Sequence, residues 1–256
     1  MSEIATVVKL SLRSTKCSEC GLQKICISKG LNGSELKALD DIISSNLKYS
    51  ADSHLYRQGI PFQGLYVIKS GSTKSSIISV DGNEQIVGFQ FPGDILGLDA
   101  FQNRLHTSSV IFLENSVVCH MPYDRFNVLC DRIPSLHHRL QSLSSCEITH
   151  DHELFMTISQ KTAQQRIAFF LMEIVYRLHL TWRNEIIVTL PMQRNEIGNY
   201  LGLTQETVSR IFTKFDREGI ISVSGKIVRI IDWCRLEEFV SFCNRCSEII
   251  CHHEVT

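Results

Sequence analysis

The sequence predicts an α+β protein built from an N-terminal β-roll, a long helix and a C-terminal winged helix-turn-helix. Short β-rich runs separated by glycines fill residues 54–122. No glycine or proline interrupts residues 135–158, and a compact two-helix pattern follows at 194–212. The expected parts are a cysteine-rich segment (1–30), the roll (31–133), the long helix (134–160) and the helix-turn-helix domain (161–256).

The N-terminal segment combines three cysteines with little hydrophobic periodicity. Cys17, Cys20 and Cys26 are spaced as Cys-x2-Cys-x5-Cys. We therefore expect a loop that is organised by something other than a hydrophobic core. A helix is expected next, over residues 33–47 with Ser34 as its N-cap, because apolar residues recur there at helical intervals.

The roll is predicted from five short β-rich runs that are punctuated by Gly, Pro and Asp residues. These runs are 65–68, 75–80, 85–91, 108–113 and 116–121. Strands of this length and spacing are typical of a small antiparallel barrel or jelly roll. Asp81-Gly82, between two of the runs, is the strongest hairpin-turn signal in the chain.

The long helix carries one narrow apolar stripe. Ile148, Asp151, Phe155 and Ile158 recur in steps of three and four, which is the seam spacing of a coiled coil. Such a helix usually needs a partner, so we expect a homodimer seam. Asp151 would place two carboxylates opposite each other in that seam, where desolvation and repulsion oppose dimerisation.

The helix-turn-helix is predicted from glycines at two critical positions. Gly198 permits the close crossing of two helices, and Gly202 permits a positive φ in the turn between them. Five apolar residues have the spacing expected of a small core between the two helices: Ile197, Leu201, Leu203, Val208 and Ile211. A helix over 162–180 precedes the pair, and a β-hairpin over 220–231 follows it as a wing.

The second helix of the pair presents polar residues suited to reading DNA. With Thr204 as its N-cap, the early exposed positions include Glu206, Ser209 and Arg210, whose side chains can bond base edges in the major groove. The residues expected to contact the DNA backbone are Thr204, Gln205, Lys214, Arg217 and Lys226. The alternative is a purely structural helix pair in which Glu206 and Arg210 form an i,i+4 ion pair.

Composition excludes several protein classes. The chain has 256 residues, of which 43% are hydrophobic and 21% are charged, and this is an ordinary globular balance. A net charge of -1 argues against non-specific coating of nucleic acid. No apolar run approaches the ~20 residues of a membrane helix, and no cleavage site follows the N-terminus. We expect a cytoplasmic protein without a membrane partner.

The ten cysteines indicate metal or redox chemistry, because a chain with a normal core composition is unlike a secreted disulfide scaffold. Three thiolates at the N-terminal spacing can bind one face of an iron–sulfur cubane, and Cys119, on a predicted strand before the long helix, is a suitable fourth ligand. Zinc suits four thiolates equally well. Cys130, Cys146 and Cys234 are interpreted as ordinary core or surface residues.

Together, the roll, the long helix and the winged helix-turn-helix resemble the cAMP receptor/FNR family of bacterial transcription regulators. The cysteine motif over 17–26 with the distant Cys119, and the sequence Glu206-Thr-Val-Ser209-Arg210, resemble its oxygen-sensing FNR branch. The resemblance implies a [4Fe-4S] cluster that promotes homodimerisation and DNA binding, and that oxygen destroys to release the DNA. The cluster ligands it implies are Cys17, Cys20, Cys26 and Cys119.

The resemblance also implies a palindromic operator similar to TTGAT-N4-ATCAA, read by Glu206, Ser209 and Arg210. It implies a contact with RNA polymerase through the turn residues Asp81, Gly82, Asn83 and Glu84. Family members often carry Ser directly after the second cysteine, where this chain has Gly21. We therefore expect Gly21 to tune the access of oxygen.

Other functions remain open as alternatives. A receptor for a cyclic nucleotide would need an Arg for the phosphate, whereas this chain has Leu98-Asp99 and Leu105-His106-Thr107-Ser108, so no cyclic nucleotide is expected. A zinc-stabilised regulator of the same fold is a further alternative. Cys243, Cys246 and Cys251 have the spacing of a second metal site. No nucleophile motif is recognisable, so we do not expect an enzyme.

Overall fold

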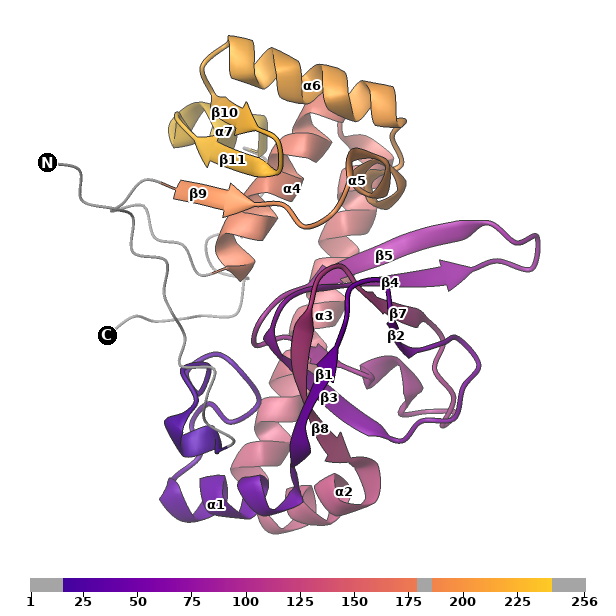
Figure 1. The fold of residues 1–256 in the computed structure, drawn as a ribbon, viewed down its shortest axis with the longest axis vertical. Coiled ribbons are helices and arrows are strands. Elements are labelled where there is room, and N and C mark those ends of the chain that lie inside the picture. The colour runs from indigo at the N-terminus through magenta and orange to yellow at the C-terminus, as the bar shows by residue number, and fades with distance from the viewer. Residues whose placement is uncertain (1–15, 179–185, 241–256) are drawn as a thin grey trace, which may run out of the picture. The chain divides into compact units, whose positions relative to one another are not determined.

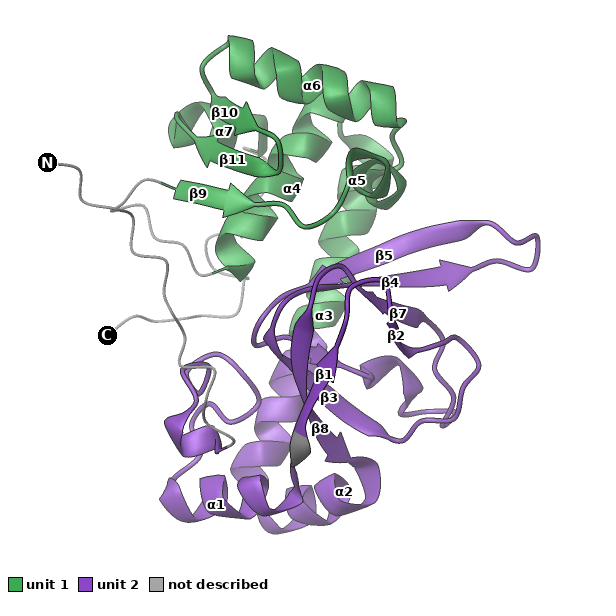
Figure 2. Ribbon diagram, in the orientation of Figure 1, with its two compact units in different colours: residues 1–7, 146–256 green, residues 8–145 purple. Residues whose placement is uncertain are grey.

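A computed structural model describes residues 16–178 and 186–240. The chain divides into two compact units, one ending at residue 145 and the other beginning at residue 146 (Figure 2). Figure 1 shows the elements of each unit. No helix among the described residues is long and apolar enough to cross a membrane.

The first unit contains the predicted β-roll. Its strands are β1 (Ser44–Tyr49), β2 (His54–Tyr56), β3 (Gly64–Ser70), β4 (Thr73–Ile78), β5 (Glu84–Gln90), β6 (Ile95–Leu96), β7 (Ser109–Phe112) and β8 (Ser116–Pro122). They form two four-stranded antiparallel sheets, ordered β1-β8-β3-β6 and β2-β7-β4-β5. Apolar side chains from both sheets form one buried cluster: Tyr56, Tyr66, Ile68, Leu96, Val110, Phe112 and Val118.

The predicted helix over 33–47 begins at the correct residue, but its predicted N-cap and its C-terminal end are wrong. Helix α1 spans Gly33–Ile42, and its N-cap is Asn32 rather than Ser34, because the Asn32 side chain accepts the backbone N–H groups of Ser34 and Glu35. Leu47 belongs to strand β1, where it pairs with Val118 of β8. Pairing with a distant strand therefore overrides the local helical spacing.

The predicted hairpin turn at Asp81-Gly82 is confirmed. It joins β4 to β5, Gly82 has φ +81°, and the backbone N–H of Ser79 donates to the carbonyl oxygen of Asn83 at 2.9 Å. Asp81, Gly82, Asn83 and Glu84 are all exposed.

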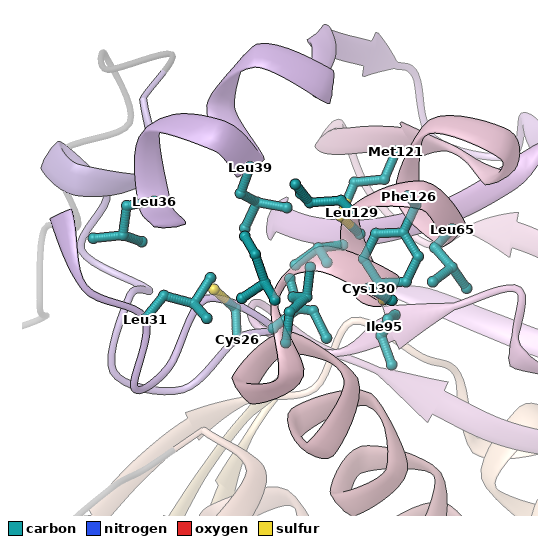
Figure 3. Close-up of a cluster of buried hydrophobic side chains, with 14 of the residues drawn as sticks. Cys26, Leu31, Leu36, Leu39, Leu65, Ile95, Met121, Phe126, Leu129 and Cys130 are labelled. Atoms are coloured by element: carbon teal, nitrogen blue, oxygen red, sulfur yellow. The ribbon is translucent and has the colours of Figure 1, made fainter. Parts of the chain in front are cut away.

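A second apolar cluster joins the roll to helices and to the cysteine-rich segment (Figure 3). Helix α2 (Tyr123–Arg132), which the sequence did not predict, contributes Phe126 and Leu129, and helix α1 contributes Leu36 and Leu39. The first turn of the long helix α3 (Pro134–Gln160) adds Leu136, which is fully buried. This cluster therefore holds the cysteine-rich segment, helices α1 and α2, and the start of α3 against the roll.

The second unit contains the predicted winged helix-turn-helix. Its elements after α3 are α4 (Ala163–Arg177), β9 (Ile186–Thr189), α5 (Arg194–Leu201), α6 (Gln205–Arg217), β10 (Ile221–Ser224), β11 (Ile227–Ile230) and α7 (Trp233–Val240). The wing is a three-stranded sheet ordered β10-β11-β9, of which the sequence predicted only the β10–β11 hairpin. The predicted fold class is confirmed.

The crossing of α5 and α6 depends on the two predicted glycines. A Cβ atom on Gly198 would lie 2.6 Å from the carbonyl oxygen of Leu203, and Gly202 has φ +63°. The Thr204 side chain accepts the backbone N–H of Thr207 at 3.2 Å and so caps α6 as predicted. Both glycines are therefore required by the backbone itself.

A buried carboxylate holds three helices of the second unit together. Glu173 of α4 accepts from the Arg177 Nε atom at 3.1 Å and from the Tyr200 hydroxyl of α5 at 3.1 Å. The His150 Nε2 atom of α3 lies 3.4 Å from the same carboxylate. Burial, and then the charge of Glu173, raise the pKa of Tyr200, so this hydroxyl remains a donor.

The variant Gly198→Ala tests the close helix crossing. The added methyl group collides with the backbone of Leu203, so we expect the free energy of unfolding of this unit to fall by about 1–3 kcal/mol. Urea titration followed by tryptophan fluorescence measures this, because Trp233 lies in the unit. The control is Asn195→Ala, which changes an exposed position of α5 in the same unit. Equal stability of the two variants would contradict the required approach.

Candidate metal centre and nucleic-acid interface

The segment that carries three of the predicted ligands is folded against the roll by apolar anchors. Cys17 begins the short helix η1 (Cys17–Glu19), and Cys20 is its C-cap. Leu22 and Ile27 are each only 3% exposed, and the backbone N–H of Cys26 donates to the carbonyl oxygen of Leu22. The expectation of a loop without a hydrophobic core is therefore wrong, because these two side chains join the cluster drawn in Figure 3.

The four predicted cluster ligands meet on that same core. Cys26 is buried in it, while Cys17, Cys20 and Cys119 are partly buried and pack against it. Cys119 lies on β8, opposite Asn46 of β1 and Val67 of β3. Within the described residues, no group of three or more His, Cys, Asp or Glu side chains is arranged to hold a metal ion as it stands.

Electrostatic coupling between the thiols follows from their proximity. Burial raises the pKa of Cys17 well above its usual range, and Asp40, Cys26 and Cys119 raise it further. Burial raises the pKa of Cys119 to about 11, although the charge of Lys69 lowers it. Burial also raises the pKa of Cys26. Each thiol whose pKa is raised is therefore protonated at neutral pH until a cation compensates its charge.

The donor set fits a thiolate-bound metal or cluster. Four soft sulfur donors on one core suit an iron–sulfur cluster and zinc alike. Cys130 is buried in the same core and Cys234 is exposed, in agreement with their ordinary interpretation, whereas Cys146 is disulfide-bonded. Cys243, Cys246 and Cys251 lie outside the described residues. Gly21 occupies an exposed turn directly after Cys20.

Several residues around the cysteines were not identified from the sequence. Asp40 accepts the backbone N–H of Cys17 at 2.6 Å, and Asn46 lies 3.7 Å from the Cys119 sulfur and 3.4 Å from the Lys69 ammonium. Lys69 is only 3% exposed although it is charged. Their partners are distant in the sequence, so no local pattern indicated them.

Arg139 of α3 fastens the cysteine segment to the long helix. Its Nη2 atom donates to the carbonyl oxygen of Ile25 at 2.8 Å, and its Nε atom donates to that of Cys26 at 3.3 Å. Burial lowers the pKa of Arg139, while the charge of Cys26 raises it. In the sequence, Arg139 shares a helical face with Leu136 and Leu143, which is a signal that it lies near the core.

The predicted dimer seam lies largely on an exposed face of α3. Ile148 is 56% and Phe155 is 70% exposed, and Asp151 is also exposed. Ile158 is only half-exposed, because it approaches the turn between α5 and α6 near Gly202. Met156, which the sequence analysis did not single out, is 47% exposed beside Phe155. Such a row of large apolar side chains at the surface of one helix is suited to a partner.

The predicted base-reading residues are all accessible on α6. Glu206, Ser209 and Arg210 are exposed, whereas Val208 and Ile211 are buried on the opposite face of the helix. This strong separation of polar and apolar faces leaves the N-terminal half of α6 free to enter a groove.

The residues predicted to contact the DNA backbone differ in the hydrogen bonds that they make within the protein. Gln205 and Arg217 are exposed, and Thr204 is occupied as the helix cap. The Lys214 ammonium contacts Gln164 at 3.1 Å and Glu218 at 3.8 Å. The Lys226 ammonium donates to the carbonyl oxygen of Pro191 at 3.1 Å. The two lysines would have to exchange these weak surface contacts for phosphates.

Two arginines that the sequence analysis missed support the helix pair. Arg166 donates to the carbonyl oxygens of Leu201 and Gly202 at 3.0 and 3.3 Å and so satisfies the end of α5. The Arg194 guanidinium lies 3.6 Å above the centre of the Phe212 ring, and burial lowers its pKa.

Comparison with known proteins agrees with this architecture. A family model described as the Crp-like helix-turn-helix domain matches residues 165–239, and one described as the cyclic nucleotide-binding domain matches residues 46–133. The structure of FixK2 from Bradyrhizobium japonicum is similar, with a TM-score of 0.70 and 28% identity, over 76% of this chain and 96% of FixK2.

Relatives with similar sequences cover almost the whole chain. Transcriptional activator protein anr of Pseudomonas aeruginosa is 37% identical over 227 residues, or 89% of this chain and 93% of its own length. The fumarate and nitrate reduction regulatory protein of Yersinia pestis is 37% identical over 214 residues, or 84% of this chain and 86% of its own. The chain therefore belongs to the FNR branch of the CRP/FNR family, whose members are DNA-binding transcription regulators and not enzymes.

Proposed function

We propose that the chain is an oxygen-responsive global transcription regulator in which Cys17, Cys20, Cys26 and Cys119 hold a [4Fe-4S] cluster. The loaded chain forms a homodimer that binds a palindromic operator resembling TTGAT-N4-ATCAA, and oxygen destroys the cluster so that DNA is released. A bound cluster supplies the chemistry that reacts with oxygen. The name of one relative, the anaerobic regulatory protein of Pasteurella multocida, supports this assignment.

The convergence of the four cysteines on the core that includes the start of α3 carries the proposal. Leu136 of α3 is part of that core, and Arg139 bonds the backbone on which Cys26 lies. Any change in the position of this backbone must therefore change the bonding of a half-buried guanidinium. The ligand set thus has a direct physical connection to the helix that carries the seam.

The role of Asp151 follows from its position among exposed apolar residues. In a dimer seam formed by Ile148 and Phe155, the two Asp151 carboxylates are desolvated and close together, which opposes association. The dimer forms when ligation at the start of α3 outweighs this penalty. Dimers align two recognition helices on half-sites about 34 Å apart, which a monomer cannot do.

Three finer assignments stay predictions. Gly21 adjoins the ligand Cys20 and is proposed to set how readily oxygen reaches the site. The exposed turn Asp81, Gly82, Asn83 and Glu84 is proposed to contact RNA polymerase. The proposed domains are 1–30 for ligation, 31–133 for the roll, 134–160 for dimerisation and 161–256 for DNA binding, although the two compact units meet inside α3.

The variant Cys26→Ser tests the ligand set. Protein purified without oxygen is expected to be straw-brown and to contain iron and sulfide, and the variant is expected to lose most of both, because one iron has no thiolate ligand. The matched control is Cys130→Ser, which changes a buried thiol of the same core and should retain iron. Metal analysis and the visible spectrum measure the result. Colourless wild-type protein with bound zinc would overturn the cluster and favour a zinc-stabilised regulator.

The variant Asp151→Ala tests the seam. Removing the carboxylate removes the repulsion, so we expect the air-purified variant to dimerise and bind operator DNA without iron. Analytical ultracentrifugation and a DNA-binding assay measure this. Asp131→Ala, which removes an exposed carboxylate from α2, serves as the control and should remain monomeric in air. A monomeric Asp151→Ala protein would exclude Asp151 as the switch.

The variant Arg210→Ala tests base reading by α6. Loss of a bidentate contact to guanine should cost about 1–3 kcal/mol on the operator and nearly nothing on a site changed at that guanine. Arg217→Ala is the control, because loss of a phosphate contact should weaken both sites alike and reduce the salt dependence of binding. Full discrimination by the Arg210→Ala protein, measured by fluorescence anisotropy, would contradict its role.

A further inference from the structure

The carboxylate of Asp99 lies at the centre of a polar cluster in the roll. Asp99 belongs to the short helix η2 (Leu98–Ala100). Its Oδ2 atom accepts the backbone N–H groups of Thr107 and Ser108 at 2.8 and 3.1 Å and the hydroxyls of the same residues at 3.3 and 3.1 Å. The His106 Nδ1 atom lies 3.2 Å from Oδ1. Five donor atoms therefore converge on one side chain.

These donors stabilise the ionised form of the carboxyl group. Burial raises the pKa of Asp99, but hydrogen bonds from His106, Ser108 and Thr107 outweigh burial, and the pKa lies below its usual value. Because a carboxylate only accepts hydrogen bonds, the His106 Nδ1 atom carries the hydrogen. The cluster is thus an anion bound by a set of directed donors.

Packing holds the donors in place independently of the carboxylate. The His106 ring is stacked on Tyr56 with the centroids 3.5 Å apart, and it meets the Phe62 ring in a T-shaped arrangement with the centroids 5.6 Å apart. His106 and Ser108 are 3% and 8% exposed. The imidazole and the serine therefore cannot turn away easily, and the donor set is preorganised.

The donor set has the chemistry of a phosphate site. Consecutive backbone N–H groups form an anion-binding concavity, and hydroxyl and imidazole donors strengthen the hold on an oxyanion. The residues lie inside the segment 46–133 that matches the cyclic nucleotide-binding domain, and a nucleotide presents a phosphate anion. In this chain the Asp99 carboxylate accepts the hydrogen bonds of these donors.

We propose that Asp99 is an internal ligand, whose carboxylate fills an anion-binding nest that would otherwise take a phosphate group. The loop at Thr107 and Ser108 consequently keeps its conformation without a diffusible effector. A tethered carboxylate loses no translational freedom on binding, whereas a free phosphate does, so phosphate does not displace it. The proposal is independent of the metal centre, because no cysteine takes part.

The full-length variant Asp99→Ala tests the nest with inorganic phosphate as the probe. We expect the variant to be less stable than the wild type in potassium chloride, and to regain stability saturably when phosphate replaces chloride at equal ionic strength. At a phosphate concentration about ten times its dissociation constant, the folding equilibrium constant should rise about tenfold. The amide NMR signals of Thr107 and Ser108 should shift with phosphate in the variant and not in the wild type.

The control is Asp94→Ala, which removes a second carboxylate of the roll, one that accepts the backbone N–H of Phe91 at 2.9 Å. This variant should lose stability without any rescue by phosphate. Replacing phosphate by cyclic AMP distinguishes a nucleotide phosphate from the free ion, since stronger rescue identifies a site that also accommodates the nucleoside.

Two results would overturn the proposal: an Asp99→Ala protein that ignores both anions, or wild-type Thr107 and Ser108 amides that respond to phosphate. If the alanine variant does not fold, Asp99→Asn keeps the shape of the side chain and removes its charge. Phosphate should then displace the neutral amide and shift the same two signals. The wild-type titration decides against the proposal without any variant.

Discussion

The bonding of the Arg139 guanidinium to the carbonyl oxygens of Ile25 and Cys26 is the interaction on which the candidate site depends. It crosses from the long helix to the cysteine segment, two parts of the chain that also pack on one apolar core. A guanidinium cannot lose its charge in a protein, so it must keep acceptors of this kind when it is half-buried. The backbone beside Cys26 and the first turns of α3 therefore move together or exchange these bonds.

The burial of the thiols is a second constraint on the candidate metal centre, because it affects whether they carry a charge. Burial in or against the apolar core disfavours the thiolate forms of Cys17, Cys26 and Cys119. Ligation by a cation reverses that preference, and the cost of releasing the protons is offset by the metal–sulfur bonds. The core is consequently compatible with neutral thiols when no metal is bound and with thiolates when a metal is bound. The cysteines whose charge would change lie on the same core as Leu136, and Arg139 bonds the carbonyl oxygen of Cys26. Under the proposed function, ligation would act first on the start of α3.

Local patterns in the sequence were sufficient for the helix-turn-helix, because its geometry depends on residues that are close together. Gly198, Gly202 and Thr204 each meet a requirement of the neighbouring backbone, and the structure contains all three features as predicted. Strand β1 was missed because its apolar residues continue the helical spacing of α1, and only pairing with β8 distinguishes the two. Arg139 was missed for the same reason, since its acceptor at Cys26 is 113 residues away.

Asp99 shows why a negative inference from sequence was incomplete. The absence of an arginine predicted that no cyclic nucleotide binds, but it did not predict what the polar residues at 106–108 do instead. Buried donors without an acceptor destabilise a fold, so a roll that lacks an anionic ligand needs another acceptor for the donors of His106 and Ser108. An internal carboxylate meets this requirement and leaves the roll folded in the absence of any effector. The cysteine segment, which Arg139 bonds to α3, then offers a route by which a signal reaches this helix without any ligand in the roll.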